Sequence, residues 1–199
     1  MRIKLYIEGG GDSALQDTLF REGWQAFFQN AGLAGRMPRT FRGSGRESTF
    51  DAYQTAVRQK KPDELPLLLV DSENLIADGN SEWAHLKEQD GWVKPEGAGD
   101  EDAFLMVCCM ETWFLADREA LRKFFHECWR DNAVPQWPDL EAVPKATIFE
   151  KLALATAGCG KKSYAKGKLS FEILKVIDPK IVEAKCPGAK RLLYRMRSL

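Results

Sequence analysis

Carboxylates follow short apolar runs at two distant places in the sequence. Glu8 ends the run IKLYIE, and Asp71 and Glu73 come at the end of the run LPLLLVDSE. Because residues two apart share one face of an extended chain, Asp71 and Glu73 are expected on the same side. Carboxylate oxygens suit Mg²⁺ or Mn²⁺, and such an ion could polarise a phosphodiester and generate hydroxide from water. The pattern predicts a metal site with Glu8, Asp71 and Glu73 as its ligands and catalytic residues.

Two further acids follow the next apolar run. Glu111 lies just past residues 103–109, and Asp117 stands six positions later in the stretch METWFLAD. These carboxylates could serve a second metal ion. They could equally cap and solvate the helix that this stretch predicts.

Three glycines follow Glu8 in IEGGGDS and raise the alternative of a phosphate-binding loop. No Lys follows them at the position that a P-loop requires. The dinucleotide pattern G-x-G-x-x-G/A is formally present from Gly9 to Ala14, but Glu8 would place a negative charge beside a pyrophosphate. We interpret the glycines as a turn that lets Glu8 and a bound phosphate approach closely, with Gly10 and Gly11 as phosphate contacts. A nucleotide-binding enzyme is the alternative.

Basic residues gather in two glycine-bearing stretches, FRGSGRES and YAKGKLSFEIL. The formal net charge is zero, yet residues 71–120 hold thirteen acidic and three basic residues, and residues 160–199 hold eleven basic and three acidic ones. These faces could attract each other within the fold, or the basic ones could hold a polyanion beside an acidic metal centre. The candidate contacts to nucleic-acid phosphate are Arg42, Arg46, Lys162, Lys166 and Lys168.

The elements that would position these residues alternate along the chain. Apolar runs predict strands at 3–7, 37–42, 65–71 and 103–109, and amphipathic patterns predict helices at 12–30, at 48–60 and over METWFLADREALRKFF. This alternation indicates an α/β fold with a mostly parallel central sheet flanked by helices. Ligands of such sheets bind at the carboxyl ends of the strands, which is where Glu8 and Asp71 stand.

The domain organisation predicted from these patterns has two parts. Residues 1–130 form the α/β domain, with an irregular insertion at 74–100 that carries a short helix near 82–89. Residues 131–199 form a basic, mainly helical extension packed on that domain, with helices at 147–157 and 169–177 after a proline-rich loop.

The composition favours a globular protein of the cytoplasm. Hydrophobic residues make up 44% of the chain, and no run approaches the roughly 18 apolar residues that span a bilayer. The opening residues do not resemble a signal peptide. The five cysteines have no framework spacing and predict reduced, mostly buried thiols. We expect no membrane contact, and self-association is left open.

Several stretches resemble known families. A strand that ends in hydrophobic-Glu-Gly, then a helix, and a later strand that ends in an acidic pair resemble the TOPRIM domain. That domain is shared by topoisomerases, primases and overcoming-lysogenization-defect (OLD-type) nucleases. More closely, IEGGGDS, FRGSGRESTFDAY, LLLVDSEN, LMVCCMETWFLADREAL and YAKGKLSFEIL resemble a bacterial family that is catalogued as a domain of unknown function and treated as TOPRIM-like.

The resemblance implies a TOPRIM-like, Rossmannoid fold. Glu8 then matches the TOPRIM general acid/base or metal-ligand Glu, and Asp71 and Glu73 match its acidic metal pair. Glu73 departs from the pattern, because the TOPRIM domain has a second Asp there, and a longer arm changes the metal geometry. Members of the family are often encoded beside AAA-type ATPases, as in phage-defence pairs, which implies an ATPase partner.

Residues and resemblance together predict a Mg²⁺- or Mn²⁺-dependent endonuclease that cleaves RNA or DNA within a bacterial phage-defence module. The alternative is a non-catalytic TOPRIM-like docking subunit of an ATPase complex, in which the acids are structural.

Overall fold

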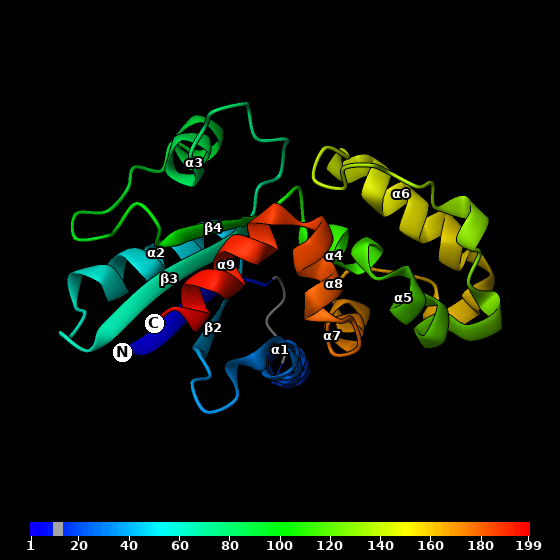
Figure 1. Ribbon diagram of the computed structural model, residues 1–199, viewed down its shortest axis with the longest axis horizontal. Helices are drawn as coiled ribbons and strands as arrows, with labels where there is room; N and C mark the ends of the chain where they lie inside the picture. Colours follow the sequence, from blue (N-terminus) through cyan, green and yellow to red (C-terminus); the bar gives the residue numbers. More distant parts are fainter. Residues whose placement is uncertain (10–13) are drawn as a thin grey trace.

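The computed structural model describes residues 1–9 and 14–199 of the chain. A parallel sheet forms the core of its fold (Figure 1). Its strands are β1 (Arg2–Glu8), β2 (Arg39–Gly43), β3 (Glu64–Asp71) and β4 (Ala103–Met106), in the order β2-β1-β3-β4. All three strand pairings are parallel. The predicted α/β class with a parallel sheet flanked by helices is therefore confirmed.

Both faces of the sheet are covered, which explains why its central strand is almost continuously apolar. One face packs against helices α1 (Ala14–Phe28) and α9 (Pro187–Arg197) through side chains such as Leu5, Ile7 and Leu67. The opposite face packs against α2 (Arg46–Arg58) and α3 (Glu82–Asp90) through Tyr6, Leu68 and Val70. In Figure 1, α3 lies on one side of the sheet and α1 on the other.

The first helices follow the sequence patterns closely. Helix α1 continues into a π-helical turn, η1 (Gln29–Leu33), and Gly32 adopts a positive φ of 83° near its end. Helix α3 lies in the irregular insertion, where a short helix was predicted near 82–89. Its N-cap is Ser81, whose hydroxyl accepts a hydrogen bond from the backbone N–H of Ala84.

The stretch METWFLADREALRKFF forms two helices, and not the single one that its pattern predicted. Helix α4 (Met110–Ala116) ends at Asp117, and α5 (Arg118–Phe125) starts there. The backbone of Asp117 is not helical, and its side chain accepts a hydrogen bond from Ala120 N–H. An aspartate cap thus starts a new helix in a new direction.

The C-terminal part contains more helix than the sequence predicted. After the short turns η2 (His126–Cys128) and η3 (Asp131–Ala133) come α6 (Lys145–Thr156), the turn η4 (Ala157–Lys162), α7 (Lys168–Leu174), α8 (Pro179–Lys185) and α9. Helices α8 and α9 were missed because Pro179 and Pro187 look like helix breakers. Both stand at the first turn of a helix, where proline is well tolerated.

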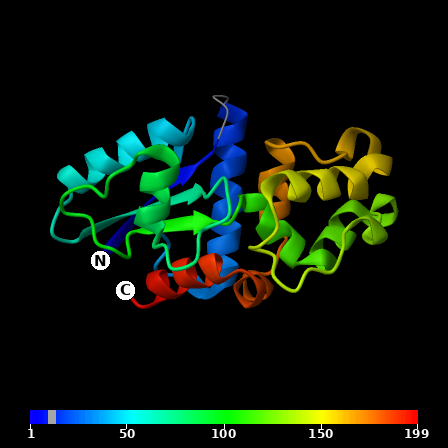
Figure 2. The same cartoon turned by 90° about the horizontal axis from the view of Figure 1, so that it is seen from above.

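The C-terminal helices pack onto the elements that precede them. Helix α7 lies along α1, and α9 returns to β4 at the edge of the sheet. Figure 2 shows α5, α6 and α7 grouped at one end of the molecule, beside the sheet. One hydrophobic cluster joins the sheet face, α1 and residues of α4 to α9, so the C-terminal part shares the core of the α/β part.

The cysteines differ in part from the prediction of reduced thiols. Cys108, Cys109 and Cys186 are free and buried, as predicted. Cys128 and Cys159 form a disulfide between η2 and η4. The spacing of the cysteines does not indicate this disulfide, because only the fold brings the two turns together. Among the described residues, no helix combines the length and the apolar character needed to cross a membrane.

Candidate metal centre

Three predicted acids meet at the carboxyl edge of the sheet. Glu8 ends β1 and Asp71 ends the neighbouring strand β3, since Ile7 pairs with Leu69 in the register. Glu73 follows in a turn whose φ is 65° at this residue. One carboxylate oxygen from each of the three lies within 4.8 Å of the others. Parallel neighbouring strands thus bring together residues that are 63 positions apart in the chain, as the sequence analysis predicted.

Asp71 is the most buried of the three acids, with a side chain only 5% exposed. Its Oδ1 accepts a hydrogen bond of 3.0 Å from the backbone N–H of Met110, at the start of α4. Burial raises the pKa of Asp71 to about 7, and the nearby carboxylates of Glu111 and Glu8 act in the same direction. Lys145 is the foremost cation that opposes this rise of the pKa.

Lys145 is a component of the site that sequence reasoning missed. It is the first residue of α6, and its Nζ lies 3.3 Å from Asp71 Oδ2 and 2.6 Å from Glu73 Oε1. Burial alone would lower the pKa of Lys145, but the attraction of Asp71 and Glu73 outweighs it and raises the pKa. A lone lysine after a proline-rich loop carries no sequence signal that would assign it to acids 72 and 74 residues away.

Arg46 stands at the other end of the acidic group. Its Nη1 donates a hydrogen bond of 3.1 Å to Glu8 Oε2 and one of 2.6 Å to the backbone carbonyl of Asp71. The rest of the guanidinium makes a bidentate pair with Asp90 at 2.7 Å. The sequence analysis predicted that Arg46 contacts phosphate. In the structure, its guanidinium group pairs with the carboxylates of Glu8 and Asp90. Asp90, at the end of α3, was not among the predicted site residues.

The second predicted pair of acids does not join the group. Glu111 is fully buried, and its Oε1 accepts a hydrogen bond of 2.5 Å from the Tyr164 hydroxyl, while its Oε2 has no hydrogen-bond partner among the described residues. Asp117 caps α5 and accepts a further hydrogen bond, of 2.8 Å, from the backbone N–H of Asp178. The structure thus gives Asp117 a capping role and places Glu111 beneath the site.

The predicted phosphate contacts lie in different surroundings. Arg42 has a side chain only 9% exposed, and its Nε pairs with Asp17 Oδ1 at 2.8 Å. Lys166 is half exposed, with its Nζ 3.6 Å from Asp71 Oδ2, and Lys162 is exposed at the end of η4. Lys168 begins α7, but its side chain lies outside the described part of the chain, as do Gly10 and Gly11 entirely.

Gly9 shows why the residue after Glu8 has no side chain. A Cβ at this position would lie 2.9 Å from Cγ of Arg42 and 3.3 Å from the Phe20 ring. The missing side chain at Gly9 accommodates the stem of Arg42, and the predicted approach of a phosphate to this loop stays a prediction.

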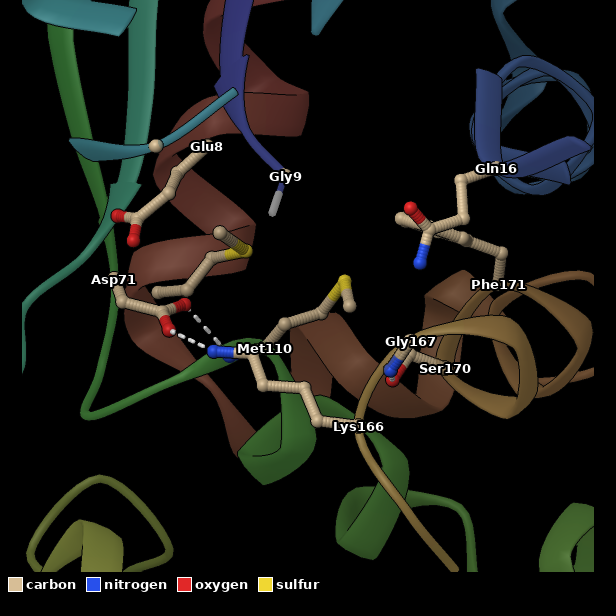
Figure 3. A pocket seen from close by; sticks show the side chains of 11 residues that line it. Glu8, Gly9, Gln16, Asp71, Met110, Lys166, Gly167, Ser170 and Phe171 are labelled. Atoms are coloured by element: carbon tan, nitrogen blue, oxygen red, sulfur yellow. Dashed lines mark hydrogen bonds and ion pairs between the residues drawn. The ribbon is translucent and has the colours of Figure 1, made fainter. Parts of the chain in front are cut away.

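A cavity of about 430 Å³ opens beside Glu8 and Asp71, and we call it the acidic cavity. Figure 3 shows these two carboxylates on one side of it and Gln16 and Phe171 on the other. Lys166 and Gly167, which precede α7, complete its wall. The acids therefore border a space of the size that small ligands occupy.

The donor set fits a hard divalent cation. Glu8, Asp71 and Glu73 offer only carboxylate oxygens, which Mg²⁺ and Mn²⁺ prefer, and one oxygen of each lies within 4.8 Å of the others. Lys145 and Arg46 balance part of the negative charge. A cation that bound to Asp71 and Glu73 would have to displace the ammonium group of Lys145 from their oxygens.

Comparison with known proteins identifies the family. A family model described as a domain of unknown function, DUF4276, matches residues 7–197. No curated protein and no solved structure gave a significant match. The matched segment contains the acidic group, Lys145, strands β2, β3 and β4, and the last two residues of β1. The chain belongs to the DUF4276 family.

Proposed function

We propose that this protein is a Mg²⁺- or Mn²⁺-dependent nuclease that hydrolyses phosphodiester bonds of RNA or DNA. The observation that carries the proposal is the convergence of Glu8, Asp71 and Glu73 within 4.8 Å at the edge of a parallel sheet. The resemblance of their motifs to the TOPRIM domain supports the same activity. The resemblance also supports the role in phage defence and the AAA-type ATPase partner, which we include in the proposal.

The residues take separate roles in this proposal. A bound divalent ion would polarise a phosphoryl oxygen of the substrate and activate a water molecule. Asp71 and Glu73 hold that ion. Glu8, at the border of the cavity, completes the ligand set or accepts a proton from the attacking water. Lys166 lines the same cavity, with its Nζ 3.6 Å from Asp71 Oδ2, and attracts the phosphate group.

A second ion is a further part of the proposal and involves Glu111. Its Oε2 is buried without a hydrogen-bond partner among the described residues, and its charge acts on Asp71. Asp117, the other residue predicted for this role, would have to give up two backbone hydrogen bonds.

The ion pairs around the acids favour a second candidate function. Lys145 neutralises Asp71 and Glu73, and Arg46 neutralises Glu8, as is expected of acids with a structural role. In this case the chain is a non-catalytic docking subunit of an ATPase complex.

A cleavage assay distinguishes the two functions. Labelled single-stranded RNA, tRNA and plasmid DNA are incubated with the protein in Mn²⁺ or Mg²⁺, with and without the proposed AAA-type ATPase partner. Asp71→Asn and Glu8→Gln are compared with Asp78→Asn and Glu96→Gln, which make the same changes at exposed positions.

The nuclease proposal expects cleavage that EDTA abolishes. Asp71→Asn and Glu8→Gln should reduce the rate by about 100-fold or more, since each removes a ligand, and the two surface variants should keep the normal rate. Intact substrates in every lane would exclude a nuclease and leave the docking function.

A further inference from the structure

We propose that the site acts on single-stranded nucleic acid, which lies in a groove formed by three adjoining cavities around the acids. The inference rests on the proposed function and names its substrate class. It is carried by the arrangement of the cavities, by the lysines and phenylalanines that line them, and by the burial of Asp71.

Two more cavities adjoin the acidic cavity. One, of about 710 Å³, is lined by Glu73, Lys145 and Phe149. The other, of about 550 Å³, is lined by Lys161, Lys162 and Phe124, and we call it the basic cavity. Lys166 lines both the acidic and the basic cavity, and its Nζ lies 5.9 Å from the centre of the Phe149 ring. Lys166 therefore belongs to the walls of the acidic and the basic cavity, and it approaches the third cavity through Phe149.

The basic cavity has the charge to bind a phosphate backbone. Lys161 and Lys162 are exposed, and neither has an ion-pair partner within residues 1–9 and 14–199. Lys166 adds a third ammonium group, and Glu172 brings one carboxylate to the same wall. Lysines without internal partners can neutralise phosphates and release the ions condensed on them. The basic cavity reaches the acids through Lys166, whose Nζ lies 3.6 Å from Asp71 Oδ2.

Aromatic rings accompany the lysines on both sides of the acids. Phe124 lines the basic cavity, and Phe149 lines the cavity beside Glu73. Both side chains are partly exposed, although they pack against the hydrophobic core. Basic grooves with aromatic side chains are typical of proteins that bind single strands, because every unpaired base offers a face for stacking.

The depth of Asp71 argues against a duplex substrate. The side chain of Asp71 is only 5% exposed. Lys166, which lines the acidic cavity, lies 3.6 Å from Asp71 Oδ2 and covers part of this carboxylate. A flexible single strand can bend its backbone into cavities of this size. A double helix is stiff over this length and would have to be distorted or opened to bring a phosphate to Asp71.

Binding measurements separate this inference from the proposed function. Fluorescence anisotropy with Ca²⁺ in place of Mg²⁺ gives affinities of labelled RNA and DNA strands of about 15 nucleotides, and of duplexes of the same sequence. Lys161→Gln/Lys162→Gln is compared with Lys180→Gln/Lys190→Gln, which removes two exposed lysines from α8 and α9. Phe124→Leu and Phe149→Leu remove the rings and keep apolar side chains.

We expect single strands, RNA or DNA, to bind at least about tenfold more tightly than duplexes. Lys161→Gln/Lys162→Gln should reduce the slope of log affinity against log salt by about 1.4, since each of the two lost phosphate contacts contributes about 0.7. Each phenylalanine variant should weaken binding at least about fivefold. Equal or tighter binding of duplexes, or equal effects of the two lysine pairs, would overturn the inference. Tight, selective binding without cleavage in any metal would support the inference and reject the nuclease.

Discussion

At the scale of residues, the negative charges of the site's carboxylates are compensated by cationic side chains of the same chain. Asp71 and Glu73 share Lys145, and Glu8 shares Arg46 with Asp90. Burial makes this balance necessary, because a carboxylate removed from water is costly unless a partner compensates it. The same balance places Lys145 where it competes with a divalent ion. Two predictions follow from single side chains.

Lys145→Met should lower the free energy of unfolding by about 1 to 3 kcal/mol, because it leaves Asp71 and Glu73 without their cation. Mn²⁺ should restore the loss, since an ion binds the freed carboxylates more readily than those of the unsubstituted chain. Thermal unfolding with Mn²⁺ and with EDTA measures both effects. Lys151→Met, which removes a lysine of the same helix that pairs with the exposed Glu150, is the control. An equal Mn²⁺ shift in all three proteins would contradict this account.

Glu141→Gln should change how stability depends on pH. Burial raises the pKa of Glu141 to about 7, against the hydrogen bond from Gly188 N–H and the attraction of Arg191, which lower it. A raised carboxyl pKa means that the folded state binds the proton more tightly, so stability falls as pH rises from about 4.5 to 7. Gln cannot ionise, so the free energy of unfolding of Glu141→Gln, relative to that of the unsubstituted protein, should rise by about 1 to 3 kcal/mol between pH 5 and pH 8. Urea unfolding at the two pH values measures the change, and a constant difference would refute it.

At the scale of elements, the strands and their order explain why the site could be predicted in part. The apolar run before Asp71 is diagnostic because the central strand is buried on both faces. Parallel neighbours then bring Glu8 and Asp71 together without any further information. Lys145, Asp90 and Tyr164 could not be predicted, because their positions depend on how loops and C-terminal helices pack. The same is true of helices α8 and α9, whose leading prolines resemble helix breaks.

Gly188→Ala tests the packing of α9 on the sheet. A Cβ on Gly188 would lie 2.7 Å from the backbone oxygen of Leu105 in β4, and a backbone atom cannot move aside as a side chain can. We expect a loss of about 1 to 3 kcal/mol despite the better helix propensity of alanine. The control is Gly158→Ala, whose Cβ would approach no atom closer than 3.5 Å. Chemical denaturation of both variants measures the difference, and equal stabilities would contradict the close contact.

At the scale of the whole molecule, the groove lies where the sheet meets the C-terminal helices. Its acids come from strands of the first half, and its lysines come from α6, η4 and the residues before α7. Neither half of the chain contains the complete site. Part of the charge asymmetry in the sequence is explained within the fold, where Lys166 pairs with Asp71, Arg191 with Glu82 and Arg195 with Asp102. That the lysines of the basic cavity hold a polyanion stays a prediction.

Reduction of the disulfide between η2 and η4 tests how much this bond contributes to the stability of the protein. Cys128 and Cys159 are 31 residues apart, and closing a loop of this length contributes about 3 to 4 kcal/mol by the chain-entropy estimate. Dithiothreitol should therefore lower the urea midpoint of the protein. Cys128→Ser/Cys159→Ser should start at the lower midpoint and not respond to the reductant. An unchanged midpoint after complete reduction, checked by thiol titration, would contradict the prediction.

Mn²⁺ soaked into crystals shows directly whether Glu8, Asp71 and Glu73 form a divalent-metal site. The crystals are measured at the manganese absorption edge. We expect an anomalous peak about 2 to 2.5 Å from oxygens of Asp71 and at least one of the other two acids, with Lys145 moved away from Asp71. The peak should be absent in Asp71→Asn. Crystals with no peak at these carboxylates, and with the Lys145 ion pairs intact at high Mn²⁺, would contradict the account.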